Sequence, residues 1–168
     1  GGWYGAAGAA SLSDDPDDPA SELRRFHSTA SEISRDIAAT SALLSELTQL
    51  VRRKTLFVDD TERVNWLVLR IKSNVEGLNG RLDEAGAVIS RSKRRLGSKS
   101  QAGQEASNLV GQLQEEFVKT TSGFKRVLQQ RSDNLKSAAD RKRDVMGGGG
   151  AASAPVSGSG PGGAESLV

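Results

Sequence analysis

Three long apolar stripes, each stepping by three or four residues, constrain the fold of this chain more than any other feature. That spacing keeps one side of an α-helix apolar for about seven or eight turns. A helix of that length has to bury its apolar side, and three such helices can bury one another. The residues expected to form the shared core are Phe26, Ile33, Ile37, Leu44, Leu47, Leu67, Ile71, Leu78, Leu82, Leu113, Phe117, Phe124, Leu128 and Leu135.

Composition divides the 168 residues into three segments. Residues 1–20 are rich in Gly and Ala and then acidic, so we expect them to be disordered. Residues 21–146 are predicted to form an all-α, antiparallel, up-down-up, left-handed three-helix bundle, because short connections favour antiparallel neighbours. Residues 147–168, rich in Gly, Ser and Pro, are interpreted as a flexible linker. The helices are expected at about 20–55, 60–96 and 100–145.

Residues that begin and end helices lie at the expected positions. Ser, Asp and Asn are favoured at the N-cap, Pro at the first helical position, and Gly just beyond the end. The expected caps are Asp18 before Pro19, or Ser21, for the first helix; Asp59 with Glu62, and then Gly97, for the second; and Ser98 or Ser100 for the third.

The residue types that carry catalysis and metal binding are scarce. The chain has no cysteine and a single histidine, His27, which we interpret as a partly exposed surface residue. No strand is predicted that could lead into a phosphate-binding loop. Aromatic residues make up only 4% of the chain, which is few for a surface that stacks on nucleic-acid bases. We therefore predict no enzyme activity, no metal, no cofactor and no nucleic-acid partner.

The basic residues are concentrated in the predicted bundle. All 23 lysines and arginines lie between Glu22 and Asp144, with 16 acidic residues, so that this segment carries a net charge of +7. They cluster near residues 52–54, 91–95 and 141–143, where a helix end favours cations. The alternative is a membrane or nucleic-acid footprint, although antiparallel helices would place the second cluster at the opposite end from the other two. No apolar run is long enough to span a membrane, and we expect the chain to be soluble.

Two further features of the stripes have competing interpretations. Arg131 lies on the third stripe, where its stem can pack while its head reaches solvent, or where it can form a buried ion pair. Opposite the core stripe of the second helix lies a nearly uncharged strip of small and apolar residues. This strip either covers local surface or forms a shallow docking groove for another helix. Its residues are Trp66, Leu69, Ser73, Gly77 and Gly80.

Several short segments together resemble a known family. Residues 54–61 and 71–79, with Lys54, Phe57 and the Gly-Leu-Asn at 77–79, resemble the start of the second helix of Golgi-type syntaxins. Residues 124–136, followed by the basic residues 141–143, are similar to a run in syntaxin-5-type proteins. The acidic residues 17–21 resemble plant and algal members.

The resemblance implies the N-terminal regulatory Habc domain of a Golgi-type Qa-SNARE. It implies SNARE partners, a Sec1/Munc18-type partner and a place on the cytoplasmic face of Golgi and ER–Golgi membranes. The SNARE motif and the membrane anchor of that family are missing from the sequence, and membrane association is expected only through such an anchor. A structural spacer of the spectrin-like or coiled-coil kind, and a basic lipid-binding module, remain alternatives.

Overall fold

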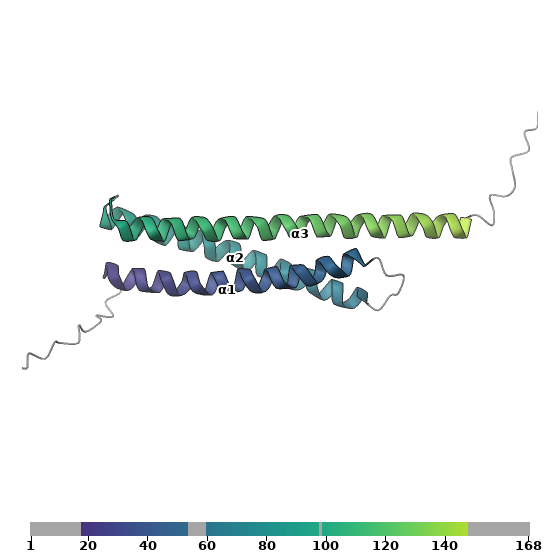
Figure 1. Cartoon of the computed structure of the whole chain (residues 1–168), viewed down its shortest axis with the longest axis horizontal. Coiled ribbons are helices and arrows are strands. Elements are labelled where there is room, and N and C mark those ends of the chain that lie inside the picture. Colours follow the sequence, from purple (N-terminus) through teal and green to yellow (C-terminus); the bar gives the residue numbers. More distant parts are fainter. Residues whose placement is uncertain (1–17, 54–59, 98, 148–168) are drawn as a thin grey trace, which may run out of the picture. The chain divides into compact units, whose positions relative to one another are not determined.

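A computed structural model of the chain describes residues 18–53, 60–97 and 99–147. It contains three helices in these ranges, α1 (Pro19–Arg52), α2 (Thr61–Leu96) and α3 (Gln101–Gly147). The chain divides into two compact units, residues 1–129 and 130–168, and α3 contributes to both. In the first unit the three helices lie side by side and alternate in direction (Figure 1). This arrangement confirms the all-α three-helix bundle.

The helix ends follow the signals in the sequence. The side chain of Asp18 accepts a hydrogen bond from the backbone N–H of Ala20 at 3.3 Å and so caps α1. Gly97 ends α2 with a φ of 85°, a left-handed conformation that glycine adopts without steric cost. Ser100 caps α3, because its hydroxyl accepts from the N–H of Gly103 at 3.3 Å.

Some end signals have a different outcome. Asp60 is the N-cap residue of α2, and its side chain forms no capping hydrogen bond. The predicted caps Asp59 and Ser98 lie outside the described residues, as do the predictions for residues 1–17 and 148–168. The last turn of α3 contains no basic residue, because the helix continues to Gly147. The helix-dipole explanation is therefore wrong for the cluster at residues 141–143, whereas α1 and α2 do end on basic residues.

The apolar stripes of the three helices meet in two core clusters. The first contains Phe26, Ala30, Ile33, Ile37, Leu78, Leu82, Ala85, Ile89, Ala106, Val110 and Leu113. The second contains Leu47, Val51, Val64, Leu67, Ile71, Phe124 and Val127. Three expected core residues, Leu44, Phe117 and Leu128, are only partly buried and pack against these clusters. Each cluster draws on all three helices, so each stripe buries its neighbours as predicted.

A layer of polar side chains separates the two clusters along every helix. Thr40 is fully buried; it donates to the carbonyl of Asp36 at 2.7 Å and accepts from the amide of Asn74 at 3.2 Å. The hydroxyls of Ser41 and Thr120 lie 3.0 Å apart, across α1 and α3. Because buried polar groups need partners, this layer favours one axial alignment of the helices over shifted ones.

Leu135 corrects the predicted core. Its side chain is 60% exposed, and Val145 and Met146 further along α3 are more exposed still. At about 1.5 Å per residue, α3 is about 70 Å long, whereas α1 and α2 are each little more than about 50 Å. The apolar stripe of α3 continues past Val127, the last buried residue of this helix, and Leu135 belongs to the second unit.

Candidate functional site

The strip predicted on α2 lies on its solvent side. We call Trp66, Leu69, Ser73, Gly77 and Gly80 the α2 outer face; all five are exposed, Trp66 by 48% and Leu69 by 69%. A Cβ atom added at Gly77 or Gly80 would meet no other atom within 4 Å. The structure thus brings the five residues together on one exposed surface and leaves room above both glycines.

One end of the α2 outer face is held by an ion pair to α1. Arg63 donates from Nε and Nη2 to the two carboxylate oxygens of Glu46, at 2.7 and 2.8 Å. The guanidinium carbon of Arg63 lies 4.5 Å from the centroid of the Trp66 ring. The hydrogen bond from Arg63 lowers the pKa of Glu46, and the same bond raises the pKa of Arg63. Trp66 is therefore positioned by an arginine that is itself fixed to the neighbouring helix.

Sequence reasoning missed this arrangement. The spacing of three residues between Arg63 and Trp66 is a signal for contact on one helix. The partner Glu46 belongs to another helix, and no local pattern in the sequence indicates that it lies opposite Arg63.

The chemistry of the α2 outer face suits a second helix. Glycine and serine allow another backbone to approach closely, and an indole ring offers a large apolar area with little conformational entropy to lose. The five residues carry no charge, so a partner would displace few bound waters from ionised groups. The arrangement can bind an apolar side of a helix but offers no catalytic group.

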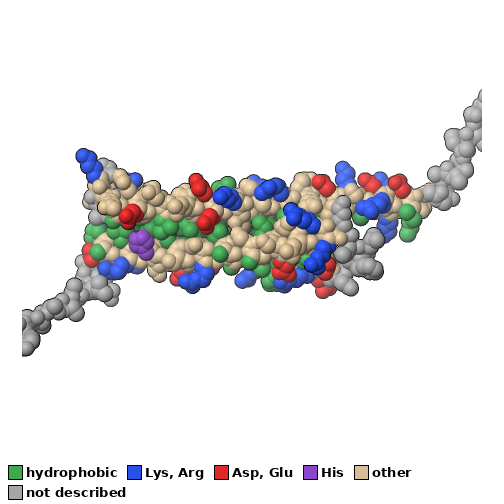
Figure 2. Space-filling model, viewed as in Figure 1, with side chains coloured by type: hydrophobic (Ala, Val, Ile, Leu, Met, Phe, Trp, Pro, Cys, Tyr) green, Lys and Arg blue, Asp and Glu red, His purple; other side chains and the backbone are tan. Residues whose placement is uncertain are grey.

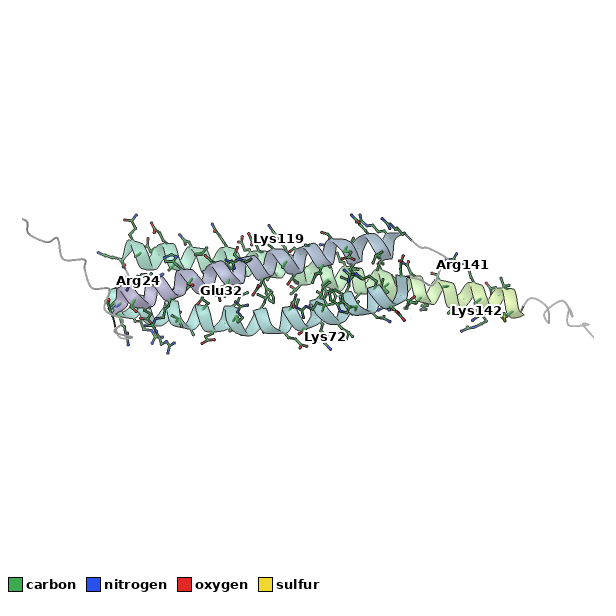
Figure 3. All side chains as sticks on the ribbon, turned by 90° about the horizontal axis from the view of Figure 1, so that it is seen from below. Arg24, Glu32, Lys72, Lys119, Arg141 and Lys142 are labelled. Carbon is green, nitrogen blue, oxygen red and sulfur yellow. The ribbon has the colours of Figure 1, made fainter. Side chains whose placement is uncertain are left out.

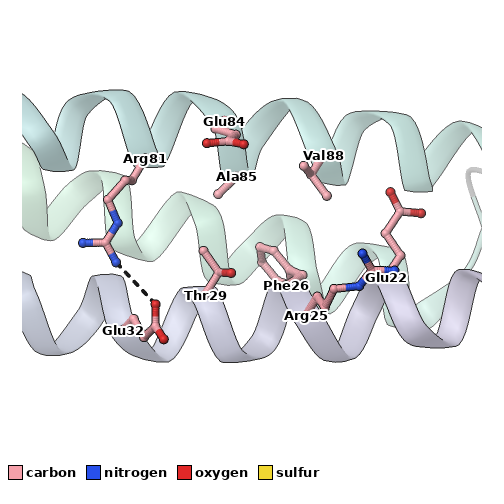
Figure 4. Close-up of a pocket in the computed structure, with 9 residues that line it drawn as sticks. All are labelled: Glu22, Arg25, Phe26, Thr29, Glu32, Arg81, Glu84, Ala85 and Val88. Carbon is pink, nitrogen blue, oxygen red and sulfur yellow. Dashed lines mark ion pairs between the residues drawn. The ribbon is translucent and has the colours of Figure 1, made fainter. Parts of the chain in front are cut away.

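A shallow groove between α1 and α2 continues this surface. From Gly80, steps of four residues along α2 lead to Glu84 and Val88, both of which line the groove. The volume of the groove is about 410 Å³, and the buried side chains of Phe26 and Ala85 form its floor. The lining residues are Glu22, Arg25, Phe26, Thr29, Glu32, Arg81, Glu84, Ala85 and Val88 (Figure 4). No sequence pattern predicted this groove, because it depends on how α1 packs on α2.

The rim of the groove is charged on both helices. Arg81 of α2 pairs with Glu32 of α1 at 3.7 Å (Figure 4), and it also contacts Asp36 of α1. At the other end, Arg95 lies 3.5 Å from Glu22. These exposed pairs are worth little in stability, but they bridge α1 and α2 at either end of the groove.

Charged side chains are spread over the first unit. The labelled cations Arg24, Lys72 and Lys119 come from α1, α2 and α3 respectively (Figure 3). Arg52 and Arg94 lie at opposite ends of the bundle, because α1 and α2 alternate in direction. The clusters at residues 52–53 and 91–95 therefore do not join into one basic surface.

The single histidine is where the sequence analysis placed it. His27 is exposed on α1, with its ring centroid 5.5 Å from that of Phe26, and is visible on the surface in Figure 2. Among the residues that the structure describes, no three His, Cys, Asp or Glu side chains come together as metal ligands would. None of the described helices combines the length and the hydropathy needed to cross a bilayer.

Comparison with known proteins relates this bundle to one class. The chain is 29% identical over 126 residues to the integral membrane protein sed5 of Schizosaccharomyces pombe, covering 75% of this chain and 40% of that protein. It is 32% identical over 117 residues to Syntaxin-5 of Drosophila melanogaster, covering 70% of this chain and 25% of the relative. With Syntaxin-31 of Arabidopsis thaliana it shares 29% identity over 139 residues, covering 79% and 41% of the two chains.

These matches define the chain as a syntaxin homologue. These homologues are syntaxin-5 and Sed5 proteins, which are Golgi Qa-SNAREs, and this confirms the resemblance found in the sequence. It spans less than half the length of these relatives. Identities to the yeast, animal and plant proteins are similar, so they do not distinguish a plant or algal origin. No family model and no solved structure matches the chain.

Proposed function

We propose that this chain is a regulatory, protein-binding domain of a syntaxin that controls SNARE complex assembly during vesicle fusion between endoplasmic reticulum and Golgi. Its homology to syntaxin-5-type proteins supports the process. The observation that supports the mechanism is the α2 outer face, an exposed uncharged strip opposite the core stripe. A SNARE helix or an assembly factor would dock on this face, and while docked it would be prevented from binding its other partners.

The dimensions of the α2 outer face suit a docked helix. From Trp66 to Gly80 it extends for about 21 Å, which matches about four turns of a partner. Trp66 would pack against the apolar side of that partner, while Gly77 and Gly80 would let the two backbones approach. The Gly- and Ser-rich sequence after α3 would act as a tether that raises the effective concentration of a helix in the same chain.

The partners and place of action follow from the same proposal. SNARE proteins and a Sec1/Munc18-type protein would be the binding partners, and the domain would work on the cytoplasmic face of Golgi and ER–Golgi membranes. The α2 outer face would then act as a switch, because a helix bound there cannot enter a SNARE complex at the same time.

Fluorescence anisotropy tests the proposal directly. The probe is a labelled peptide of the SNARE motif of Drosophila Syntaxin-5, titrated with the full chain. We expect saturable binding that Trp66→Ala weakens at least about tenfold, since loss of a buried aromatic anchor costs 1–2 kcal/mol or more. Circular dichroism should show that the variant unfolds at nearly the same temperature.

Val118→Ala is the matched control. Val118 is 57% exposed on α3, so this change removes exposed apolar area away from the α2 outer face. It should leave binding unchanged. Equal weakening by the two substitutions, or the absence of peptide binding, would contradict the proposal.

A further inference from the structure

The end of α3 separates its charges onto two sides. At 100° per residue, about half the circumference of the stretch 130–147 carries four cations and no acid. These cations are Arg131, Lys136, Lys142 and Arg143. The opposite half carries the three aspartates of the stretch, Asp133, Asp140 and Asp144. Arg141 is the one cation outside the basic half, on a different side of the helix from Lys142 (Figure 3).

The basic half of this stretch is also the apolar one. Leu135, Val145 and Met146 lie on it, with 60%, 81% and 76% of their area exposed. We call these three residues with the four cations the basic apolar face. All of it belongs to the second compact unit of the chain.

The helix dipole does not account for these cations. Arg143 and Lys142 precede the last turn of α3, in which no basic residue lies. An isolated exposed apolar residue needs no explanation, but three of them on the same side as four cations form a pattern. Basic amphipathic helices of this type bind anionic surfaces.

The positions of the cations favour a bilayer over a partner helix. A second helix would pack along the seam Arg131, Leu135, Ala138, Lys142 and Val145, whose spacing alternates between four and three. Two of these five residues, Arg131 and Lys142, are positively charged. Enclosing both charges between two helices would cost free energy. At a membrane surface the same long side chains extend to the headgroups while their stems remain among apolar atoms.

We propose that the basic apolar face binds the anionic surface of a lipid bilayer, with the end of α3 lying in the plane of the interface. Leu135, Val145 and Met146 would enter the boundary between headgroups and acyl chains. Lys136, Lys142 and Arg143, all exposed, would pair with acidic headgroups, and the aspartates would face away from them. This membrane contact is separate from any anchor and from the helix docking proposed for α2.

Vesicle flotation of the full chain tests this proposal. The probes are phosphatidylcholine vesicles with and without about one third phosphatidylserine. We expect binding only to the anionic vesicles, weakened by salt of about 0.5 M. Because each cation near the surface contributes about a fivefold factor, the double variant Lys142→Glu, Arg143→Glu should bind at least about 25-fold more weakly.

The double variant Arg52→Glu, Arg53→Glu is the matched control, because it reverses two exposed cations at the end of α1. It should retain binding, whereas the apolar variant Val145→Ser, Met146→Ser should lose much of it. Equal weakening by both charge-reversal pairs would show that net charge alone acts, and would overturn the proposal. The absence of binding to anionic vesicles would overturn it too. The proposal would also be overturned if Lys142→Glu, Arg143→Glu weakened binding of the SNARE-motif peptide but not binding of vesicles. The basic apolar face would then bind a helix.

Discussion

Arg63 of α2 donates two hydrogen bonds, of 2.7 and 2.8 Å, to the carboxylate of Glu46 on α1. The same guanidinium lies 4.5 Å from the ring of Trp66. A residue that anchors the proposed docking face is thus connected to the neighbouring helix through one side chain. The α2 outer face is therefore fixed relative to α1 at the end where its largest residue lies.

The Glu46–Arg63 pair should make stability depend on pH in acid. The hydrogen bond lowers the pKa of Glu46 in the folded chain, so the stabilisation is present above the ordinary value near 4.5 and is lost as pH falls through the lowered value. Glu46→Gln should consequently lower the free energy of unfolding at pH 7, and much less at an acid pH well below 4.5. Urea titrations at both pH values measure this difference.

The control for that prediction is Glu115→Gln, which changes an exposed carboxyl group on α3. It should leave the free energy of unfolding at pH 7 nearly unchanged. If the two variants lose the same stability at pH 7, the pair does not act as described.

Gly77 should be replaceable by alanine with a gain in stability. It lies exposed in the interior of α2, and a Cβ there meets no neighbour. Gly77→Ala should therefore raise the free energy of unfolding by up to about 1 kcal/mol, the difference in helix propensity. Gly123→Ala should gain less, because its Cβ would lie 3.0 Å from Cδ2 of Leu44. Chemical unfolding of the two variants decides it, and equal gains would be evidence against this packing at Gly123.

Core and face substitutions should separate stability from binding. Leu78 is 2% exposed, so Leu78→Ala should cost about 2–5 kcal/mol in unfolding free energy. Replacing a buried Phe by Ala costs at least about 3 kcal/mol. Because Phe117 is only partly buried, Phe117→Ala should cost about 3 kcal/mol or less. Trp66→Ala should leave stability within about 1 kcal/mol of the original chain. Calorimetry measures all three, and a Trp66 variant that unfolds like a core variant would rule out a free α2 outer face.

The polar layer should contribute little to the stability of the bundle but should define the axial alignment of its helices. Thr40→Val with Thr120→Val would join the two apolar clusters and should change stability by no more than about 1 kcal/mol. Asn74 and Ser41 would then lose partners across the helices. Amide hydrogen exchange should consequently be faster near residues 40, 74 and 120. Unchanged exchange in the double variant would show that the layer does not define the alignment.

The helical stripes could be predicted because helix periodicity is a property of the backbone. Spacing alone identified Ile33, Leu67 and Leu113 as core residues, and all three are buried. The same spacing failed at Leu135, since a stripe shows which side of a helix is apolar but not whether anything covers it. The caps Asp18 and Gly97 were predictable because they depend on neighbouring residues only.

The features that depend on helix alignment could not be predicted. The contact between Ser41 and Thr120 joins residues 79 positions apart, and that between Glu46 and Arg63 crosses from α1 to α2. The groove floored by Phe26 and Ala85 depends on the same alignment. For the α2 outer face, the sequence predicted the residues and their exposure, but not the arginine that positions Trp66.

Amide NMR of the isotope-labelled chain, titrated with the SNARE-motif peptide of Drosophila Syntaxin-5, can show whether a helix docks on the α2 outer face. Gly77 and Gly80 are useful reporters, because both lie on the α2 outer face with open space above them. We expect saturable shifts of these two amides and of the Trp66 indole N–H, with little change at Val118 on α3. Shifts centred on Val118, or saturation without any change at Gly77 and Gly80, would contradict it.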